Sequence, residues 1–198
     1  MADRGRPRKF DRDAALRSAM RVFWAKGYDH ASLADLTKAM GIVGPSLYAA
    51  FGDKETLFRE AVALYQATVG RDIWEALEEQ PTVRGAVERF LVNTAKSYAE
   101  ADAPPGCMIV LAALNLEGSP AVADVLKTMR AVNIDQLRNR FERGVADREL
   151  PADFDCTAAG TYYATLQHGM SILARDGADA ATLEMVARIG AASLSAIT

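Results

Sequence analysis

The chain has 198 residues, of which 50% are hydrophobic and 25% are charged, and it contains 14 glycines. This ordinary globular composition excludes a disordered, collagen-like or low-complexity chain. The net charge of −3 is unevenly spread, because residues 1–60 carry 11 Lys and Arg against 8 Asp and Glu, whereas residues 61–198 carry 12 against 18. The overall charge argues against a polyanionic partner, but the first 60 residues are compatible with one.

The sequence shows no membrane helix, export signal or metal site. Its longest apolar run covers residues 107–114, whereas a membrane-spanning helix needs roughly 18 apolar residues. The N-terminus lacks an apolar segment with a cleavage site, so we expect a cytoplasmic protein without a membrane partner. Cys107 and Cys156 form no Cys-x-x-Cys motif, and we expect reduced thiols and no cofactor.

The first nine residues form a basic arm. It carries four cations, Arg4, Arg6, Arg8 and Lys9, against one acidic residue, and Gly5 and Pro7 disfavour a helix. Such an arm suits a phosphate-lined groove. The alternative is a solvated terminus that only aids solubility.

Residues 11–65 predict four helices, each bounded by an N-cap or by a glycine that can adopt a left-handed conformation. The expected N-caps are Asp11 or Asp13, Ser32 with Asp35 in a capping box, Gly44 ahead of Pro45, and Asp53. The expected stops are Gly27, Gly41 and Gly52. The second and third helices are short, at little more than two turns each.

Helical periodicity continues to the end of the chain. We expect helices from residue 82 through 94, over 107–116, from 120 to about 150, from 153 or 155 to about 175, and from 179 or 182 to 197. No segment shows the alternation of β-branched and polar residues that is typical of a β-strand. The sequence therefore predicts an all-α fold of about nine helices.

Residues 31–50 have the pattern of a helix-turn-helix, with two short helices, a glycine-containing turn and a longer helix on each side. Ile42, Leu47 and Phe51 can point inward, which leaves a thin face of small and polar residues free to enter a major groove. Lys54 lies at the start of the next helix, where its charge, the helix dipole and free backbone amides suit a phosphate. The Tyr48 hydroxyl can donate to another phosphate.

A set of spaced residues gives this segment a family resemblance. They are Phe23, Gly27, Tyr28, Ser32, Leu33, Leu36, Gly41, Ile42, Leu47, Tyr48, Phe51 and the run 52–58. Through them, residues 14–62 resemble the DNA-binding domain of the TetR family of bacterial transcription regulators. The segment 45–55, Pro-Ser-Leu-Tyr-Ala-Ala-Phe-Gly-Asp-Lys-Glu, resembles one subgroup of it.

The resemblance implies a basic arm over residues 1–9, a three-helix helix-turn-helix domain over 10–70, and a larger helical domain over 71–198 for effector binding and dimerisation. It implies a homodimeric, ligand-responsive repressor that binds a palindromic double-stranded DNA operator, one half-site for each subunit. The candidate DNA contacts are Arg6, Arg8, Lys9, Ser32, Leu33, Val43, Gly44, Pro45, Ser46, Tyr48 and Lys54.

The third helix departs from the family in two ways. Val43 stands where family members often carry serine as the helix cap. The helix also has no Arg, Asn or Gln for bidentate base contacts, so base preference would depend on Ser46, on the apolar surfaces of Val43 and Pro45, and on DNA shape.

The last two helices carry small residues at close spacing, which allows close helix packing. These residues are Ala158, Ala159, Gly160, Ala164, Ala187, Gly190, Ala191 and Ser193. We expect the two helices to pair with their copies in a four-helix dimer interface. The alternative is packing within one chain.

The middle helices mix apolar bulk with isolated polar groups, as binding pockets for small-molecule effectors do. The candidates are Trp74, Phe90, Tyr98, Met108, Leu111, Asn115, Phe141, Tyr162, Gln167 and His168. Each residue taken singly fits a place in the core at least as well.

Two other functions compete with a regulator. A helix-turn-helix protein that has lost DNA binding could act as a protein-interaction adaptor, although the basic arm, Tyr48 and Lys54 argue against it. A small helical enzyme could use His168 with Tyr162 or Tyr163. The chain has no nucleophile elbow, phosphate loop or paired metal ligands, so we expect no enzyme.

Overall fold

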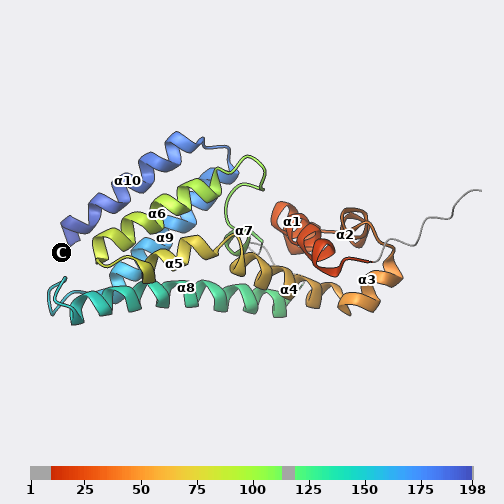
Figure 1. Ribbon diagram of the computed structural model, residues 1–198, viewed down its shortest axis with the longest axis horizontal. Coiled ribbons are helices and arrows are strands. Elements are labelled where there is room, and N and C mark those ends of the chain that lie inside the picture. Colours follow the sequence, from red (N-terminus) through yellow and green to blue (C-terminus); the bar gives the residue numbers. More distant parts are fainter. Residues whose placement is uncertain (1–9, 113–118, 198) are drawn as a thin grey trace, which may run out of the picture.

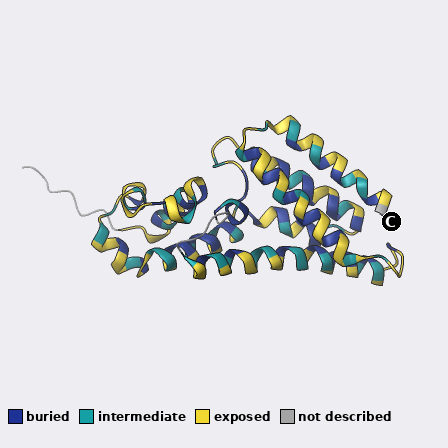
Figure 2. Ribbon diagram, turned by 180° about the vertical axis from the view of Figure 1, so that it is seen from behind, coloured by how far each residue is buried: buried dark blue, intermediate teal, exposed yellow. Residues whose placement is uncertain are grey.

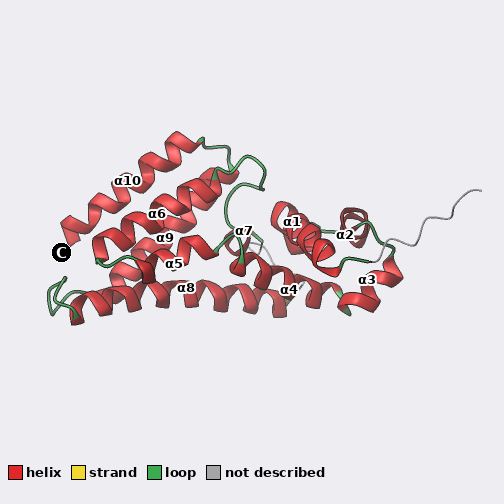
Figure 3. Ribbon diagram, in the orientation of Figure 1, coloured by secondary structure: helices red, strands yellow, loops and turns green. Residues whose placement is uncertain are grey.

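The computed structural model describes residues 10–112 and 119–197, and this part of the chain contains ten helices and no strand (Figure 1, Figure 3). The helices are α1 (Arg12–His30), α2 (Leu33–Met40), α3 (Gly44–Phe51), α4 (Lys54–Ala67), α5 (Arg71–Glu79), α6 (Val83–Tyr98), α7 (Met108–Leu111), α8 (Pro120–Ala146), α9 (Cys156–Arg175) and α10 (Ala180–Ile197). The all-α prediction is confirmed. None of the described helices has the length and apolarity that crossing a membrane requires.

The molecule is elongated, with α1, α2 and α3 at one end and the bundle of α5, α6, α8, α9 and α10 at the other (Figure 1). At the small end, aromatic side chains fill the space between α1 and α4, and the Phe23 and Phe58 rings meet edge to face with centroids 5.0 Å apart. Leu36 from α2 and Leu47 from α3 are fully buried beside them. This core holds the two short helices on a support of two longer ones.

In the large end, α6 packs along α10 and α8 packs along α9. Figure 2 shows that the buried residues lie on the sides of the helices that face one another. Helix α5 was not predicted from the sequence, because its N-cap is Gly70, which has no side chain to cap the helix. Its apolar residues Ile73, Ala76 and Leu77 have helical spacing and are buried. The predicted helix over 107–116 is shorter in the structure, because α7 begins at Met108 and ends at Leu111 with Ala112 as its C-cap. Residues 113–116 of the predicted helix lie outside the described part.

Helix α1 attaches the small end to the bundle. The Trp24 indole donates to the Gly106 carbonyl at 2.9 Å, and Arg175 at the end of α9 donates to the carbonyls of Trp24 and Ala25, both at 2.8 Å. Gly106 has a positive φ of 78°, and a Cβ there would lie 2.5 Å from the Ser171 carbonyl oxygen. The junction therefore requires glycine at this position.

Candidate nucleic-acid interface

Helix α2 begins at the capping box that the sequence predicted. The Asp35 backbone N–H donates to Ser32 Oγ at 3.0 Å, and the Ser32 N–H donates to Asp35 Oδ2 at 3.1 Å. Lys26 of α1 lies 2.7 Å from the same carboxylate. The ion pair with Lys26 and the bonds from Ser32 together lower the pKa of Asp35 to about 2. The start of α2 is thus fixed to α1 by charge as well as by packing.

The turn between α2 and α3 depends on Gly41, which has a φ of 67°. The N–H groups of Gly41 and Ile42 bond back to the carbonyls of Lys38 and Thr37 and close α2. The N-cap of α3 is Val43 rather than the predicted Gly44, because the extended backbone of Val43 leads directly into helical geometry at Gly44. Val43 makes no side-chain cap bond, and its carbonyl accepts from the Ser46 N–H at 3.0 Å.

One face of α3 is open to solvent. The exposed fraction of Val43 is 66% and that of Tyr48 is 50%, and Ser46 is exposed as well. The opposite face buries Leu47 and Phe51 completely or nearly so. An open groove of about 900 Å³ runs beside this face, between the start of α1, the end of α2 and α3. A short helix with one anchored and one free face can enter the major groove of DNA.

Lys54 opens α4 beside this face. Its ammonium nitrogen lies 4.4 Å from the centre of the Tyr28 ring, a cation–π distance. Burial lowers the pKa of Lys54, and the charge of Asp29 opposes this effect. Asp53 caps α4 by accepting from the Thr56 N–H at 2.7 Å, so the first turn keeps free amides near the lysine.

Arg12 has a positioning role that the sequence analysis missed. Its guanidinium lies 4.4 Å from the Phe51 ring centre, forms an ion pair with Glu60 at 2.7 Å, and donates to the Ala50 carbonyl at 3.3 Å. These contacts tie the end of α3 to α1 and α4. Sequence spacing gives no signal for a pair 48 residues apart such as Arg12 and Glu60. From the sequence alone, Arg12 is one more cation close to the basic arm.

The predicted DNA contacts that the structure describes lie on neighbouring elements at one end of the molecule (Figure 1). They are Ser32 and Leu33 at the start of α2, Val43, Gly44, Pro45, Ser46 and Tyr48 at the start of α3 and along it, and Lys54 at the start of α4. Leu33 is exposed. Arg6, Arg8 and Lys9 lie outside the described residues.

The small residues of α9 and α10 lie mostly inside the protomer. Ala159, Gly160, Ala164, Ala187 and Gly190 are buried, Ala191 and Ser193 are half-buried, and Ala158 is exposed. A Cβ on Gly160 would lie 3.0 Å from the Arg138 backbone nitrogen, so this glycine lets α9 approach α8 within one chain. The packing agrees with the intrachain alternative for the five buried residues. A dimer interface on these helices must use their other side.

That other side carries large apolar residues. The exposed ones are Tyr162, Ile172 and Leu173 on α9, and Met185 and Ile189 on α10. The exposed fraction of Ile189 is 63%. We call these five residues the α9–α10 face.

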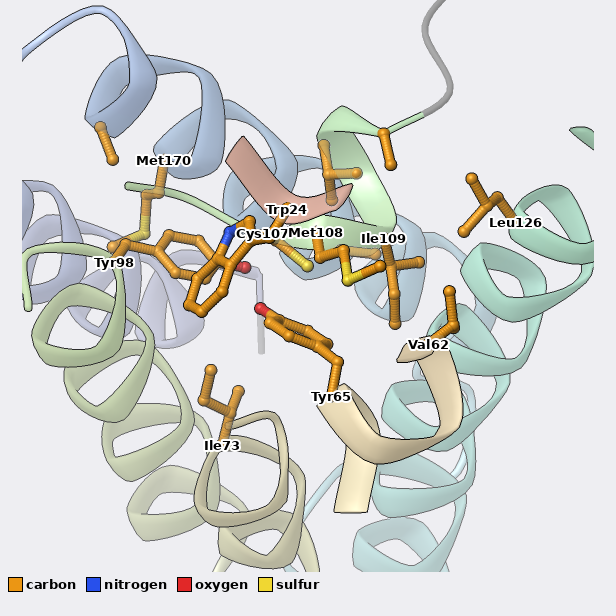
Figure 4. Close-up of a cluster of buried hydrophobic side chains, with 14 of the residues drawn as sticks. Trp24, Val62, Tyr65, Ile73, Tyr98, Cys107, Met108, Ile109, Leu126 and Met170 are labelled. Carbon is orange, nitrogen blue, oxygen red and sulfur yellow. The ribbon is translucent and has the colours of Figure 1, made fainter. Parts of the chain in front are cut away.

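The predicted ligand residues take part in several different contacts of the large end. The Trp74 and Phe90 rings pack at a tilt, with centroids 5.1 Å apart. Phe141 packs with Phe154 and Tyr163, and Tyr162 is exposed. Gln167 is buried and His168 is half-buried. Met108 and Tyr98 belong to one cluster of buried side chains (Figure 4). Leu111 is half-buried at the end of α7, and Asn115 lies outside the described residues.

Around Tyr98 the structure brings together polar groups that the sequence analysis did not combine. The hydroxyls of Tyr65 and Tyr98 point toward one another beside Cys107 and Trp24 (Figure 4). Both are buried without a hydrogen-bond partner among the described residues, and burial raises their pKa values well above the ordinary range. We call Tyr65, Tyr98 and Cys107 the buried polar cluster.

His168 lies on α9, close enough to Arg130 of α8 for the charge of the guanidinium to act on the imidazole. Its Nε2 is buried without a partner among the described residues. Burial, and next the charge of Arg130, lower the pKa of His168. The imidazole is therefore neutral at pH 7.

Comparisons with known proteins agree with this geometry. The family model for bacterial regulatory proteins of the tetR family matches residues 15–61. The transcriptional repressor ComR of Escherichia coli is 35% identical over 186 residues, which cover 93% of this chain and 89% of that protein, and the repressor BdcR of the same species is 31% identical over 87% and 83%. A cysteine mutant of the TetR-family regulator CifR, solved with 26-base-pair operator DNA, is 45% identical, with a TM-score of 0.89 and coverage of 95% of this chain and 99% of that one.

Proposed function

This chain belongs to the TetR family of bacterial regulatory proteins, and we propose that it is a cytoplasmic repressor that binds a palindromic DNA operator as a homodimer. One observation carries the proposal: α3 is anchored on one side and free on the other, with Lys54 and Tyr48 beside its free face. ComR and BdcR are named as repressors, and CifR was solved with its operator. These relatives are named as regulators and not as enzymes.

We assign DNA reading to residues 10–70. The start of α3 enters the major groove, and the phosphate contacts come from Ser32, Tyr48 and Lys54 and from the arm over residues 1–9. Phosphate contacts set the register, and base contacts select the sequence. We also assign the chain to the subgroup that shares the segment 45–55.

We assign dimerisation to residues 71–198, through the α9–α10 face. Five large apolar side chains open to solvent on two adjacent helices form the kind of patch that marks an interface. The same patch in a second subunit would cover it in a two-fold arrangement.

We assign effector binding to the buried polar cluster. Two buried hydroxyls without partners are costly unless a bound molecule supplies the missing hydrogen bonds. Cys107 follows Gly106, whose carbonyl accepts from Trp24 of α1. A molecule that shifts this segment would therefore move α1, and operator affinity would change by population shift.

The test of DNA binding uses the full chain and a random-sequence duplex between about 50 and 200 mM salt. A repressor with several phosphate contacts loses affinity linearly in a log–log plot across this range. Folded protein that binds without salt dependence, or does not bind, would favour the protein-interaction adaptor.

A further inference from the structure

Helix α3, which we propose enters the major groove, has an unusual composition for base recognition. The eight residues of α3 include no Arg, Lys, Asn, Gln, Asp or Glu, and its exposed hydrogen-bonding side chains are Ser46 and Tyr48. Bidentate recognition of guanine uses Arg or Lys, and bidentate recognition of adenine uses Asn or Gln. Helix α3 therefore cannot read purines in the usual way.

Apart from Ser46 and Tyr48, its free face is apolar. Val43 is the most exposed large apolar residue of the described chain, and Pro45 and Ala49 are exposed beside it. Pro45 and Ala49 are four residues apart and so lie on the same side of the helix. The groove next to them continues this surface through Ile42, Ala50 and Phe10.

Only thymine offers an apolar group to a reader in the major groove, because it carries a C5-methyl. We infer that α3 selects its operator by burying thymine methyl groups against Val43, Pro45 and Ala49. This inference depends on the proposed function, since it specifies which base feature the DNA reader recognises.

The charges around the α3 surface suit a DNA duplex that presents thymine methyl groups. Lys54 follows the C-terminal end of α3, and Arg12 and Lys38 line the groove beside α3. These cations suit phosphates, whereas the uncharged side chains of α3 suit base methyl groups. If the partner were instead an apolar peptide segment of another protein, these cations would contribute to its binding only if the segment also carried acidic residues.

The experiment starts from the duplex that the full chain enriches from a random DNA pool. Each thymine of a half-site is replaced in turn by deoxyuridine, which removes the methyl and leaves the hydrogen-bonding groups unchanged. At a contacted thymine we expect about fourfold weaker binding for each methyl lost, and roughly 15-fold when both half-sites are changed. Replacing such a thymine by cytosine should weaken binding, and 5-methylcytosine should restore part of it.

Protein variants connect the effect to α3. In the Val43→Ala variant, replacing one thymine by deoxyuridine should cost less binding affinity than in the wild type. A double-mutant cycle measures this difference. Val132→Ala removes the same atoms from an exposed valine of α8 and should leave the penalty unchanged.

The outcomes separate the two proposals. Tight binding that no deoxyuridine substitution weakens, or an enriched half-site without thymine, overturns the methyl readout and leaves DNA binding intact. Failure of the folded chain to enrich any duplex overturns both.

Discussion

The ammonium nitrogen of Lys54 lies 4.4 Å from the centre of the Tyr28 ring, so the last turn of α1 positions the first residue of α4. The ring restricts a side chain that would otherwise move freely in solvent. The cation is therefore held beside α3, with the free amides of α4 next to it. This arrangement suits one phosphate of a duplex.

Lys54→Ala should weaken binding to every DNA sequence. Because a homodimer loses two phosphate contacts, the slope of log affinity against log salt should fall by about 2. Fluorescence anisotropy with specific and random duplexes at several salt concentrations measures the affinity and its salt dependence. Lys96→Ala removes an exposed lysine of α6 and is the matched control. An unchanged slope for Lys54→Ala would show that this lysine touches no phosphate.

Arg12→Ala should lower stability and leave the salt slope unchanged, because the guanidinium is held by Phe51 and Glu60. Surface pairs and exposed cation–π contacts are each worth up to about 1 kcal/mol, so we expect a loss of about 1 kcal/mol in the free energy of unfolding. Urea unfolding of Arg12→Ala, Glu60→Gln and the double variant measures the coupling. Unchanged stability with a lower salt slope would instead make Arg12 a phosphate contact.

Asp35 should make stability depend on acid pH. Its pKa is lowered in the folded state to about 2, from 3.8, so the ionised carboxylate stabilises the fold above the unfolded-state pKa. This contribution is lost as the pH falls from about 4 through about 2. The difference in unfolding free energy between wild type and Asp35→Asn should be constant near neutral pH and shrink over this window. Lys26→Ala should weaken the dependence, and a difference that stays constant down to pH 2 would contradict the assignment.

Ile189→Glu should convert the dimer to a monomer, because it places a charge at the most exposed residue of the α9–α10 face. Sedimentation at several concentrations measures the association. Val132→Glu places the same charge on the exposed side of α8 and should leave the dimer intact. A dimer that tolerates Ile189→Glu would put the interface elsewhere.

Tyr98→Phe should raise the free energy of unfolding by about 1 kcal/mol, because it removes a buried hydroxyl without a partner. Tyr163→Phe is the contrasting variant, because the Tyr163 hydroxyl donates to the Gly190 carbonyl at 3.3 Å. Loss of this hydrogen bond should lower the free energy of unfolding by about 1 kcal/mol. Equal losses from both variants would mean that the Tyr98 hydroxyl is satisfied in the empty protein. It would then not mark an effector site.

Local signals predicted most of the DNA-reading domain over residues 10–70. The predicted stop at Gly27 was wrong, because α1 continues to His30 across a kink at this glycine, where φ is 75°. The Ser32 capping box, the left-handed Gly41 and the Asp53 cap lie where the sequence indicates, because each depends on residues within a few positions. The N-cap of α3 differs by one residue, from Gly44 to Val43. Helix α5 was missed because its start carries no capping side chain.

Contacts distant in sequence could not be predicted. The Arg12–Glu60 pair and the meeting of Tyr65, Tyr98 and Cys107 depend on how helices cross, which periodicity does not contain. Small residues such as Gly160 indicate close packing but do not say whether the neighbouring helix is in the same chain. Here it is α8 of the same protomer.

DNA reading by a homodimer is tested by selecting the duplexes that the full chain binds from a random DNA pool, since this selection needs no knowledge of operator or effector. We expect an inverted repeat whose half-sites lie about one helical turn apart, because two α3 helices would occupy successive major grooves. A folded, dimeric protein that enriches no sequence would contradict it.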